Sequence, residues 1–194
     1  MSMNYATIGE LKTRIGITDT TDDTVLSAVL EACSRSIDGY CNRSFGKTVP
    51  GTVRYFTPVD ADEVLIDDCV SLTEVATDAD GDRTYEDTWA ATDYDLLPEN
   101  AGTNTPYLTI ATTPDGDYGF PRVRKGLRLT GTWGWPEVPP PVKEACLIQA
   151  YRIFKRKDAP FGISGSPEMG MMRIGRLDPD VLWLLDPYRN LAVT

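Results

Sequence analysis

The chain has 194 residues, of which 41% are hydrophobic, and its formal net charge is −10. This composition supports a packed core, and the acidic balance argues against general nucleic-acid binding, which needs a basic surface. The chain has no histidine, no run of about 18 apolar residues and no basic-then-apolar leader, so we expect no histidine-based triad, no membrane-spanning helix and no signal peptide.

A short helix is predicted over residues 8–15. Thr7 stands at its N-cap with Glu10 three residues later, which is the pattern of a capping box. Gly16 can end the helix in the left-handed conformation. The local sequence therefore predicts both ends of this helix.

A longer helix is predicted over residues 22–41, and Thr20 or Thr21 can cap its first turn. Apolar residues recur in it at spacings of three and four, which is typical of a helix with one buried stripe. We therefore expect it to pack along its whole length through Leu26, Val29, Leu30, Cys33, Ile37 and Tyr40.

From about Lys47 to Trp133 the pattern changes to short runs rich in β-branched and aromatic residues, separated by turns such as "DADGDR", "PENAGTN" and "TPDGDYG". Runs with this spacing predict a small antiparallel sheet or sandwich. The predicted strands cover residues 52–58, 63–68, 71–78, 94–99, 106–114 and 126–133.

The segment "DADGDRTYED", which begins at Asp78, has the composition of a calcium loop. Its glycine falls at the fourth position, however, and Trp89 occupies the position where an EF-hand needs a bidentate glutamate. We therefore interpret the segment as a tight turn between two strands, in which Gly81 supplies a positive φ.

The stretch "GTWGWPEVPPPVKEAC" joins the last predicted strand to a third helix over residues 139–158. Prolines suit the first helical turn, because the amide that they lack would have no partner there. One tryptophan of the joint is expected to pack on the sheet and the other on the start of the helix. The predicted rigid corner consists of Trp133, Trp135, Pro136 and Pro139.

The third helix has a broad apolar surface, so we expect it to be central among the helices. A loop rich in Gly, Ser and Pro follows it, and loops of this length tend to be functional or mobile. A final helix begins after the N-cap Asp178, with Pro179 at its first position, and Pro187 ends it. The apolar surface of the third helix comprises Val142, Ala145, Cys146, Leu147, Gln149, Ala150, Tyr151, Ile153 and Phe154.

No catalytic motif stands out in this chain. It has no GxGxxG after a strand, no P-loop and no GxSxG, and its acidic residues are too many to single out a catalytic pair. We therefore expect no enzyme activity, no cofactor and no metal site. None of the cysteines forms a CxxC pair, and we interpret them as buried thiols in a reducing compartment: Cys33, Cys41, Cys69 and Cys146.

The charges are unevenly distributed along the chain. Arg83 is the only basic residue between Asp60 and Asp117, whereas residues 122–157 carry nine. This asymmetry is consistent with simple solubility, or with two surfaces that meet different partners, or each other, in an assembly. The basic end of the third helix also has two interpretations, complementing the helix dipole or contacting an acidic partner surface or DNA phosphate: Lys155, Arg156 and Lys157.

Two stretches resemble the head–tail connector (adaptor) proteins of tailed bacteriophages: "ATIGELKTRIGITDTTDDTVLSAVLEACSRSIDGYCNRSF" and "GTWGWPEVPPPVKEACLIQAYRIFKRKDAPFG". The likeness lies in an N-terminal helix that ends near an aromatic-rich "YCNRSF", and in a Gly-aromatic-Pro-x-x-Pro turn, Gly134 to Pro139, before a helix with a basic end. The ending "DPDVLWLLDPYR" is similar to that of connectors from phages of actinobacteria. The resemblance covers roughly half of the chain and contains no catalytic signature.

The fold class that we predict is α+β, a small helical bundle with a β-rich antiparallel insertion and a partly extended C-terminal segment. Residues 1–46 and 136–160 would form the helical core and residues 47–135 the insertion, with residues 161–194 as the loop and docking tail. The insertion departs from the smallest members of the family, which are almost wholly helical, so the resemblance leaves its role open.

The resemblance implies a structural role in the virion neck, between capsid and tail, after assembly in the cytoplasm of a host bacterium. Such adaptors form a ring, usually of twelve copies, beneath the portal protein. The ring extends the DNA channel, lets genomic DNA pass without specific binding, and receives the next neck or tail-completion protein. No membrane is involved.

The resemblance also implies that the C-terminal segment docks on the portal. Its apolar residues are the candidates for that contact: Phe161, Ile163, Met171, Met172, Leu182, Trp183 and Tyr188. Contacts between subunits, or with another partner, would use the basic residues near the end of the third helix: Arg152, Lys155, Arg156 and Lys157.

Two other functions remain as alternatives. A β-rich surface or carbohydrate-binding module would stack sugars on aromatic rings, for which Trp89, Trp133 and Trp135 are the candidates. A hydrolase would use acidic residues, although the chain lacks histidine and any nucleophile motif.

Overall fold

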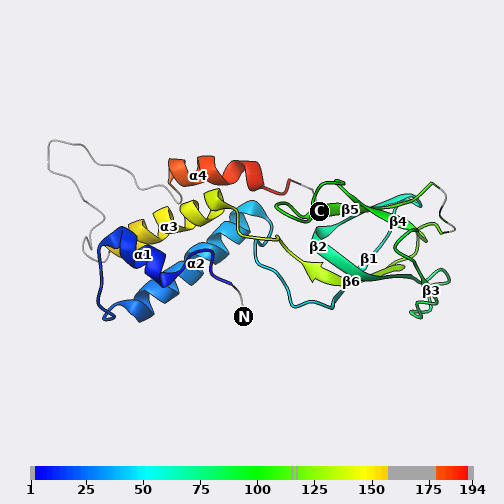
Figure 1. Ribbon diagram of the computed structural model, residues 1–194, viewed down its shortest axis with the longest axis horizontal. Coiled ribbons are helices and arrows are strands. Elements are labelled where there is room, and N and C mark those ends of the chain that lie inside the picture. The colour runs from blue at the N-terminus through cyan, green and yellow to red at the C-terminus, as the bar shows by residue number, and fades with distance from the viewer. Residues whose placement is uncertain (1–2, 115, 117, 157–177, 192–194) are drawn as a thin grey trace. The chain divides into compact units, whose positions relative to one another are not determined.

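The computed structural model describes residues 3–114, 116, 118–156 and 178–191 (Figure 1). The chain divides into two compact units. The helical unit comprises Met1–Phe45 and Val138–Thr194, and the β unit comprises Gly46–Glu137. Helices and an antiparallel sheet together confirm the predicted α+β class.

Helix α1 (Ile8–Ile15) has the two ends that its sequence predicts. The Thr7 hydroxyl accepts from the Glu10 amide at 3.2 Å, and the Glu10 carboxylate accepts from the Thr7 amide at 2.8 Å, which completes the capping box. Gly16 ends the helix at φ 83°, a left-handed conformation that glycine adopts without steric cost.

Helix α2 (Asp23–Cys41) corrects one prediction and confirms another. Its N-cap is Asp22, not Thr20 or Thr21, because Asp19 accepts from the Thr21 amide at 2.9 Å and holds the threonines in a preceding turn. The buried stripe is confirmed except at Tyr40 and Val29, which are only half-buried. The stripe consists of Leu26, Leu30, Cys33, Ser34, Ile37 and Cys41.

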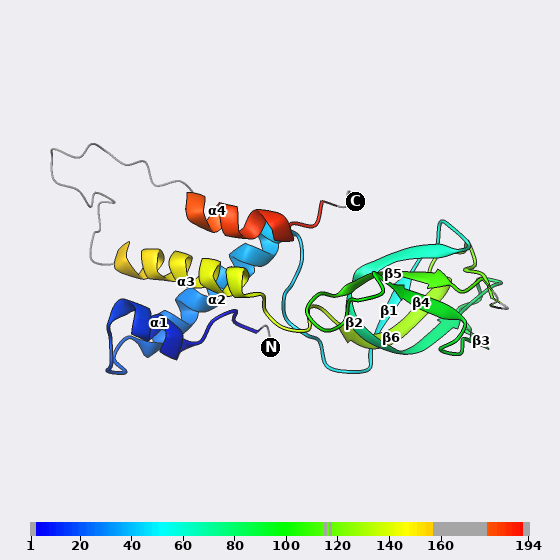
Figure 2. The same ribbon diagram turned by 45° about the horizontal axis from the view of Figure 1, so that its top comes forward.

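Helix α3 (Pro140–Lys155) is central in the helical unit, as predicted, since it contacts α1, α2 and α4 (Pro179–Leu185). Figures 1 and 2 both show it between α1 and α4. Tyr151 was expected in its buried surface, but the ring is exposed and lies under the Lys155 ammonium. The turn η2 (Asp186–Tyr188) ends the last helix around Pro187. Of the helices described, none has both the length and the apolar character that a membrane span requires.

Ion pairs tie the helices of this unit together. Lys143 of α3 contacts the Glu10 carboxylate of α1 at 2.7 Å, and Lys12 of α1 contacts Asp23 of α2 at 2.7 Å. The Lys143 ammonium, followed by the amide and hydroxyl of Thr7, donates to Glu10 and lowers the pKa of that carboxyl to about 2.

This shift predicts a pH dependence that Glu10→Gln removes. A depressed carboxyl pKa stabilises the fold above the ordinary value of 4.5, and this contribution is lost as the pH falls through about 2. We expect the wild type to exceed the variant in free energy of unfolding by at most about 1 kcal/mol at pH 7, because the pair is exposed. Urea unfolding between pH 7 and 2 should show the difference vanish on acidification. Glu31→Gln, at an exposed position of α2, is the control; equal pH profiles for both variants would contradict the prediction.

The β unit is one six-stranded antiparallel sheet, which Figure 2 shows to be strongly curved. The hydrogen-bonded order is β1-β6-β2-β5-β4, and β3 pairs with β2 outside this path. Its strands are β1 (Thr52–Phe56), β2 (Glu63–Thr77), β3 (Asp87–Thr88), β4 (Tyr94–Leu97), β5 (Tyr107–Thr112) and β6 (Leu127–Trp133).

Two predicted strands, over residues 63–68 and 71–78, are a single strand of 15 residues, β2. Its register against β6 shifts between Cys69 and Ser71 and again between Leu72 and Glu74, and such bulges bend a strand without ending it. The gap between the two predicted strands, at residues 69–70, is therefore a bend in one strand. One face of the sheet encloses the core, whose fully buried members include Val75, Ile110, Leu127, Leu129 and Trp133.

Candidate functional site

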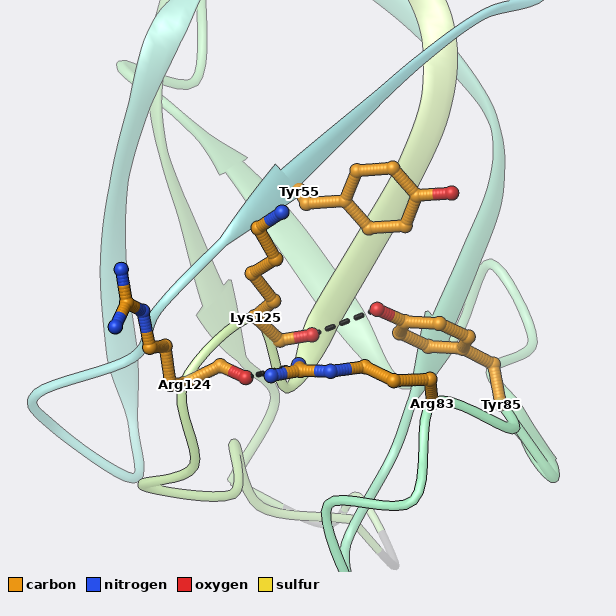
Figure 3. A pocket seen from close by; sticks show the side chains of 5 residues that line it. All are labelled: Tyr55, Arg83, Tyr85, Arg124 and Lys125. Atoms are coloured by element: carbon orange, nitrogen blue, oxygen red, sulfur yellow. Dashed lines mark hydrogen bonds between the residues drawn. The ribbon is translucent and has the colours of Figure 1, made fainter.

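A pocket of about 550 Å³ opens on the β unit (Figure 3). Three segments bring its residues together: β1, the turn between β2 and β3, and the loop before β6. Two aromatic rings and three cationic side chains line it, and we call this set the basic pocket: Tyr55, Arg83, Tyr85, Arg124 and Lys125.

Hydrogen bonds and ring contacts hold the basic pocket in shape. The Tyr85 hydroxyl donates to the Lys125 carbonyl at 2.7 Å, and the Arg83 guanidinium donates to the Arg124 carbonyl (Figure 3). The rings of Tyr55 and Tyr85 lie with centroids 5.8 Å apart, and the Lys125 ammonium lies 5.9 Å from the Tyr55 ring. These contacts join three segments that are distant in the sequence.

The backbone of the pocket is strained at two of its cationic residues. Arg83 and Lys125 have φ values of 79° and 58°, a left-handed region that costs a non-glycine residue on the order of 1 kcal/mol or more. Only Asn42 shares this feature among the other non-glycine residues that the structure describes. Strain of this kind persists where neighbouring contacts enforce it, and it is frequent at functional sites.

Asp78 enforces the conformation of the turn that carries Arg83. Its side chain is buried and accepts from the amides of Gly81 at 2.7 Å and Arg83 at 2.9 Å. Burial alone raises the pKa of this carboxyl, but these hydrogen bonds outweigh burial and hold the pKa below its ordinary value. Gly81 has the predicted positive φ, at 84°.

The basic pocket is a cationic spot on an acidic unit. The β unit holds 17 acidic and 7 basic residues, so it carries a charge of −10, whereas the helical unit holds 12 of each. Arg54 and Arg128 of the β unit form ion pairs with Asp67 and Glu74. Within the described part of the chain, the three cations of the pocket have no such carboxylate partner.

Three carboxylates of the same turn, those of Asp78, Asp80 and Asp82, have oxygen atoms within 4.8 Å of one another. Both oxygens of Asp78 already accept backbone amides, and one oxygen of each of the two exposed carboxylates, Asp80 and Asp82, accepts an amide as well, at 3.2 and 2.6 Å. Calcium takes six to eight oxygen ligands, so the described residues offer an incomplete set. We assign no metal to this cluster.

The cysteines show no sign of a reactive thiolate. All four are buried and free, as expected. Burial raises the pKa of Cys33 and Cys69 to about 12 and that of Cys41 to about 11, and it raises the pKa of Cys146 as well. A nucleophilic cysteine needs a lowered pKa and solvent access, and these residues have neither.

All four corner residues are buried; Trp133, Trp135 and Pro136 lie in the β unit, and Pro139 lies in the helical unit. The Trp133 indole donates to the Thr52 carbonyl at 2.8 Å, and its amide donates to the Thr48 hydroxyl at 2.9 Å. The Trp135 indole donates to the Asp68 carboxylate at 3.0 Å. Both tryptophans thus bond groups of the β unit. The two corner prolines are buried as well: Pro136 and Pro139.

The same burial bears on the alternative of a sugar-binding module. Trp89, Trp133 and Trp135 have exposed fractions of 5%, 0% and 6%. Trp89 is stacked against Tyr118 and Phe120, with ring centroids 5.3 and 4.7 Å away. A sugar stacks on an open ring face, so these three tryptophans cannot form a carbohydrate platform in this fold.

Three of the residues predicted to dock on the portal are described. Val181 and Leu185 are buried and seat α4 on α3, which leaves Trp183 on the opposite face with an exposed fraction of 76%. Leu182 and Tyr188 are half-buried. The other four lie outside the described residues: Phe161, Ile163, Met171 and Met172.

The basic residues near the end of α3 do not act alike. Arg152 forms an ion pair within the chain, with Asp178, the N-cap of α4. Lys155 and Arg156 are exposed at the last turn, where cations complement the helix dipole. Lys157 lies outside the described residues.

The basic pocket was not predicted from the sequence. Its residues come from three segments, and no spacing of aromatic or charged residues along the sequence indicates that these segments are neighbours in space. Two weak signals exist, namely the run "RVRK" before the last strand and the isolation of Arg83 among acidic residues.

The chain matches the sequence model of a family described as phage gp6-like head–tail connector proteins over residues 5–86. This range contains α1, α2, β1, β2 and the turn with Arg83 and Tyr85. Among curated proteins no match is found.

Solved structures share the fold over nearly the whole chain. One is a chain from the neck of an empty GTA particle, with a TM-score of 0.56 and 16% identity. Another is a chain from the virion of a native gene transfer agent (GTA) particle, with a TM-score of 0.51 and 15% identity. Each comparison covers 96% of this chain and 90% of the other. At these identities the likeness shows a common fold.

Proposed function

We propose that this chain, which matches the model of the phage gp6-like head–tail connector family over residues 5–86, is a structural subunit of the neck of a tailed phage or phage-like particle. The observation that carries the proposal is the family match over both N-terminal helices and the first two strands, supported by a shared fold with a chain from the neck of a GTA particle. The family is a structural one, and the buried thiols and missing histidine agree with a role that needs no catalysis.

The subunit would act as one copy of a ring, with twelve as the number we propose. The ring would lie beneath the portal protein, extend the DNA channel and receive the next neck or tail-completion protein. It would assemble in the cytoplasm of the host bacterium and remain in the virion. Because the whole charge of −10 resides in the β unit, acidic groups that face the channel would repel phosphates and let genomic DNA slide past.

The C-terminal segment would provide the contact with the portal. Trp183 is the described residue best suited to it, because a large exposed aromatic ring is a frequent anchor of protein interfaces. Leu182 and Tyr188 would flank this anchor. Lys155 and Arg156 would add electrostatic contacts with an acidic surface of the portal or of a neighbouring copy.

Light scattering with purified portal tests this function. We expect a monomer of 21.4 kDa alone and a ring on the portal after mixing at micromolar concentration. Trp183→Ala should weaken portal binding roughly tenfold or more, as expected for an anchor residue. Val25→Ala, at an exposed apolar position of α2, should leave it unchanged. No binding of the wild-type chain at micromolar concentration would refute the proposal.

A further inference from the structure

We propose that the basic pocket of one copy binds the acidic edge strand β4, through Asp95 and Glu99, of a second copy of this chain. The contact rests on the proposed function in one respect, since it would join neighbouring copies within the ring. The two surfaces would be the basic pocket and strand β4, and this contact would give the β unit a role that the family match leaves open.

The charges of the pocket point to a discrete anionic group. Arg83, Arg124 and Lys125 are exposed and form no ion pair among the described residues, whereas Arg54 and Arg128 each form one. A guanidinium can bind a carboxylate through two parallel hydrogen bonds. The surrounding unit carries −10, which repels an extended polyanion such as a nucleic-acid strand but lets a single acidic side chain reach the cations.

The positions of the acidic residues in the β unit indicate which of them can bind the basic pocket of another copy. Those of residues 78–87 lie on the turn that carries Arg83, on the side of the pocket itself. Those of residues 60–63 precede or begin β2, which is an inner strand of the sheet and not an edge. Asp95 and Glu99 belong to β4 and its flank, which β5, β2 and β6 separate from β1 in the strand order. Neither forms an ion pair within the described part of the chain.

The topology of the sheet supports a contact between copies. β1 and β4 end the hydrogen-bonded order of the sheet, and edge strands leave backbone groups unpaired that another chain can cover. Along the β1 edge the apolar side chains of Val53 and Tyr55 have exposed fractions of 43% and 50%. A contact between two different edges is heterologous, and repeating it from copy to copy generates a closed ring when the rotation allows.

Charge reversal on both surfaces tests the contact. Arg124→Glu with Lys125→Glu makes both surfaces acidic, and Asp95→Lys with Glu99→Lys makes both basic. Each double variant alone should form roughly tenfold fewer closed rings on the portal than the wild type, because like charges then face each other. Their equimolar mixture should restore ring formation, since every contact then pairs opposite charges. A mixture no better than its components would overturn the proposal.

Carbodiimide cross-linking of the wild-type chain is a second test, and it requires neither the portal protein nor variants. The reagent joins the Lys125 amine to a carboxylate in contact with it. A mixture of ¹⁴N and ¹⁵N chains at millimolar concentration should yield mixed-isotope peptides linking Lys125 to Asp95 or Glu99. Links from Lys125 only to other carboxylates, or none, would overturn the proposal.

Two further results separate the possible failures. If the wild-type chain does not bind portal, the proposed function fails, while the cross-linking still decides the contact between copies. An oligothymidine probe tests the other possible ligand, a nucleic acid. If the probe binds the wild type but not the Arg124→Glu, Lys125→Glu variant, and no cross-link from Lys125 to Asp95 or Glu99 forms, the pocket is a nucleic-acid site and the proposal is wrong.

Discussion

Replacing Gly134 with alanine is expected to unfold or severely weaken the β unit. Gly134 has a φ of 103°, and a Cβ atom there would lie 2.0 Å from the carbonyl oxygen of Gly46. Backbone strain and a clash with main-chain atoms that cannot rotate away add up to about 3 kcal/mol or more. We expect the melting temperature of the β unit to fall by roughly 10 °C or more in scanning calorimetry.

Gly51→Ala is the matched control for this variant. Gly51 lies in the same unit with a φ of 80°, but nothing lies within 4 Å of the Cβ position. It therefore carries the backbone strain without the clash and should cost on the order of 1 kcal/mol. Equal losses of stability in the two variants would show that the close approach of the chain at Gly46 and Gly134 is not what demands glycine.

Truncating Trp133 is expected to have a comparable effect. Its side chain is completely buried, packs against Phe56 with ring centroids 5.6 Å apart, and donates to the Thr52 carbonyl. Trp133→Ala leaves a large cavity and removes that donor, so the free energy of unfolding should fall by about 3–5 kcal/mol. Urea unfolding followed by circular dichroism measures the change.

Two further variants separate packing from hydrogen bonding. Trp133→Phe keeps an aromatic ring but loses the indole donor, and we expect a loss of about 1–3 kcal/mol. Trp183→Ala removes a tryptophan that is 76% exposed and should change stability by less than about 0.5 kcal/mol. If Trp133→Ala were as mild as Trp183→Ala, the rigid corner would not depend on its buried ring.

The helical unit was predicted well because its signals are local. A capping box begins α1 and a glycine ends it. A buried stripe marks α2, and prolines begin α3 and α4. Each signal acts within a turn or two of helix, where side chain and backbone are neighbours in sequence. The errors arose where a local alternative competed, as at Asp19, which holds Thr20 and Thr21 in a turn before α2.

The sheet was predicted only in outline. Periodicity and turns indicated most strands, but a pair of them proved to be one bent strand, β2, because pairing with β5 and β6 continues through Cys69, in the gap between the two predictions. The close approach at Gly134 could not be inferred either, since Gly46 is 88 positions away in the sequence. Strand register and close backbone contacts depend on segments that are distant in the sequence, so no local pattern predicts them.

The amino-acid sequence by itself determined the α+β class, the ends of most helices, the absence of histidine chemistry and the resemblance to connector proteins. Only the tertiary structure decided that Trp89, Trp133 and Trp135 are buried, that Trp183 is exposed, and that three distant segments form the basic pocket. The physical reason is the range of the interactions. Caps and stripes are short-range properties of the chain, whereas burial and the meeting of charges depend on how strands far apart in sequence are paired.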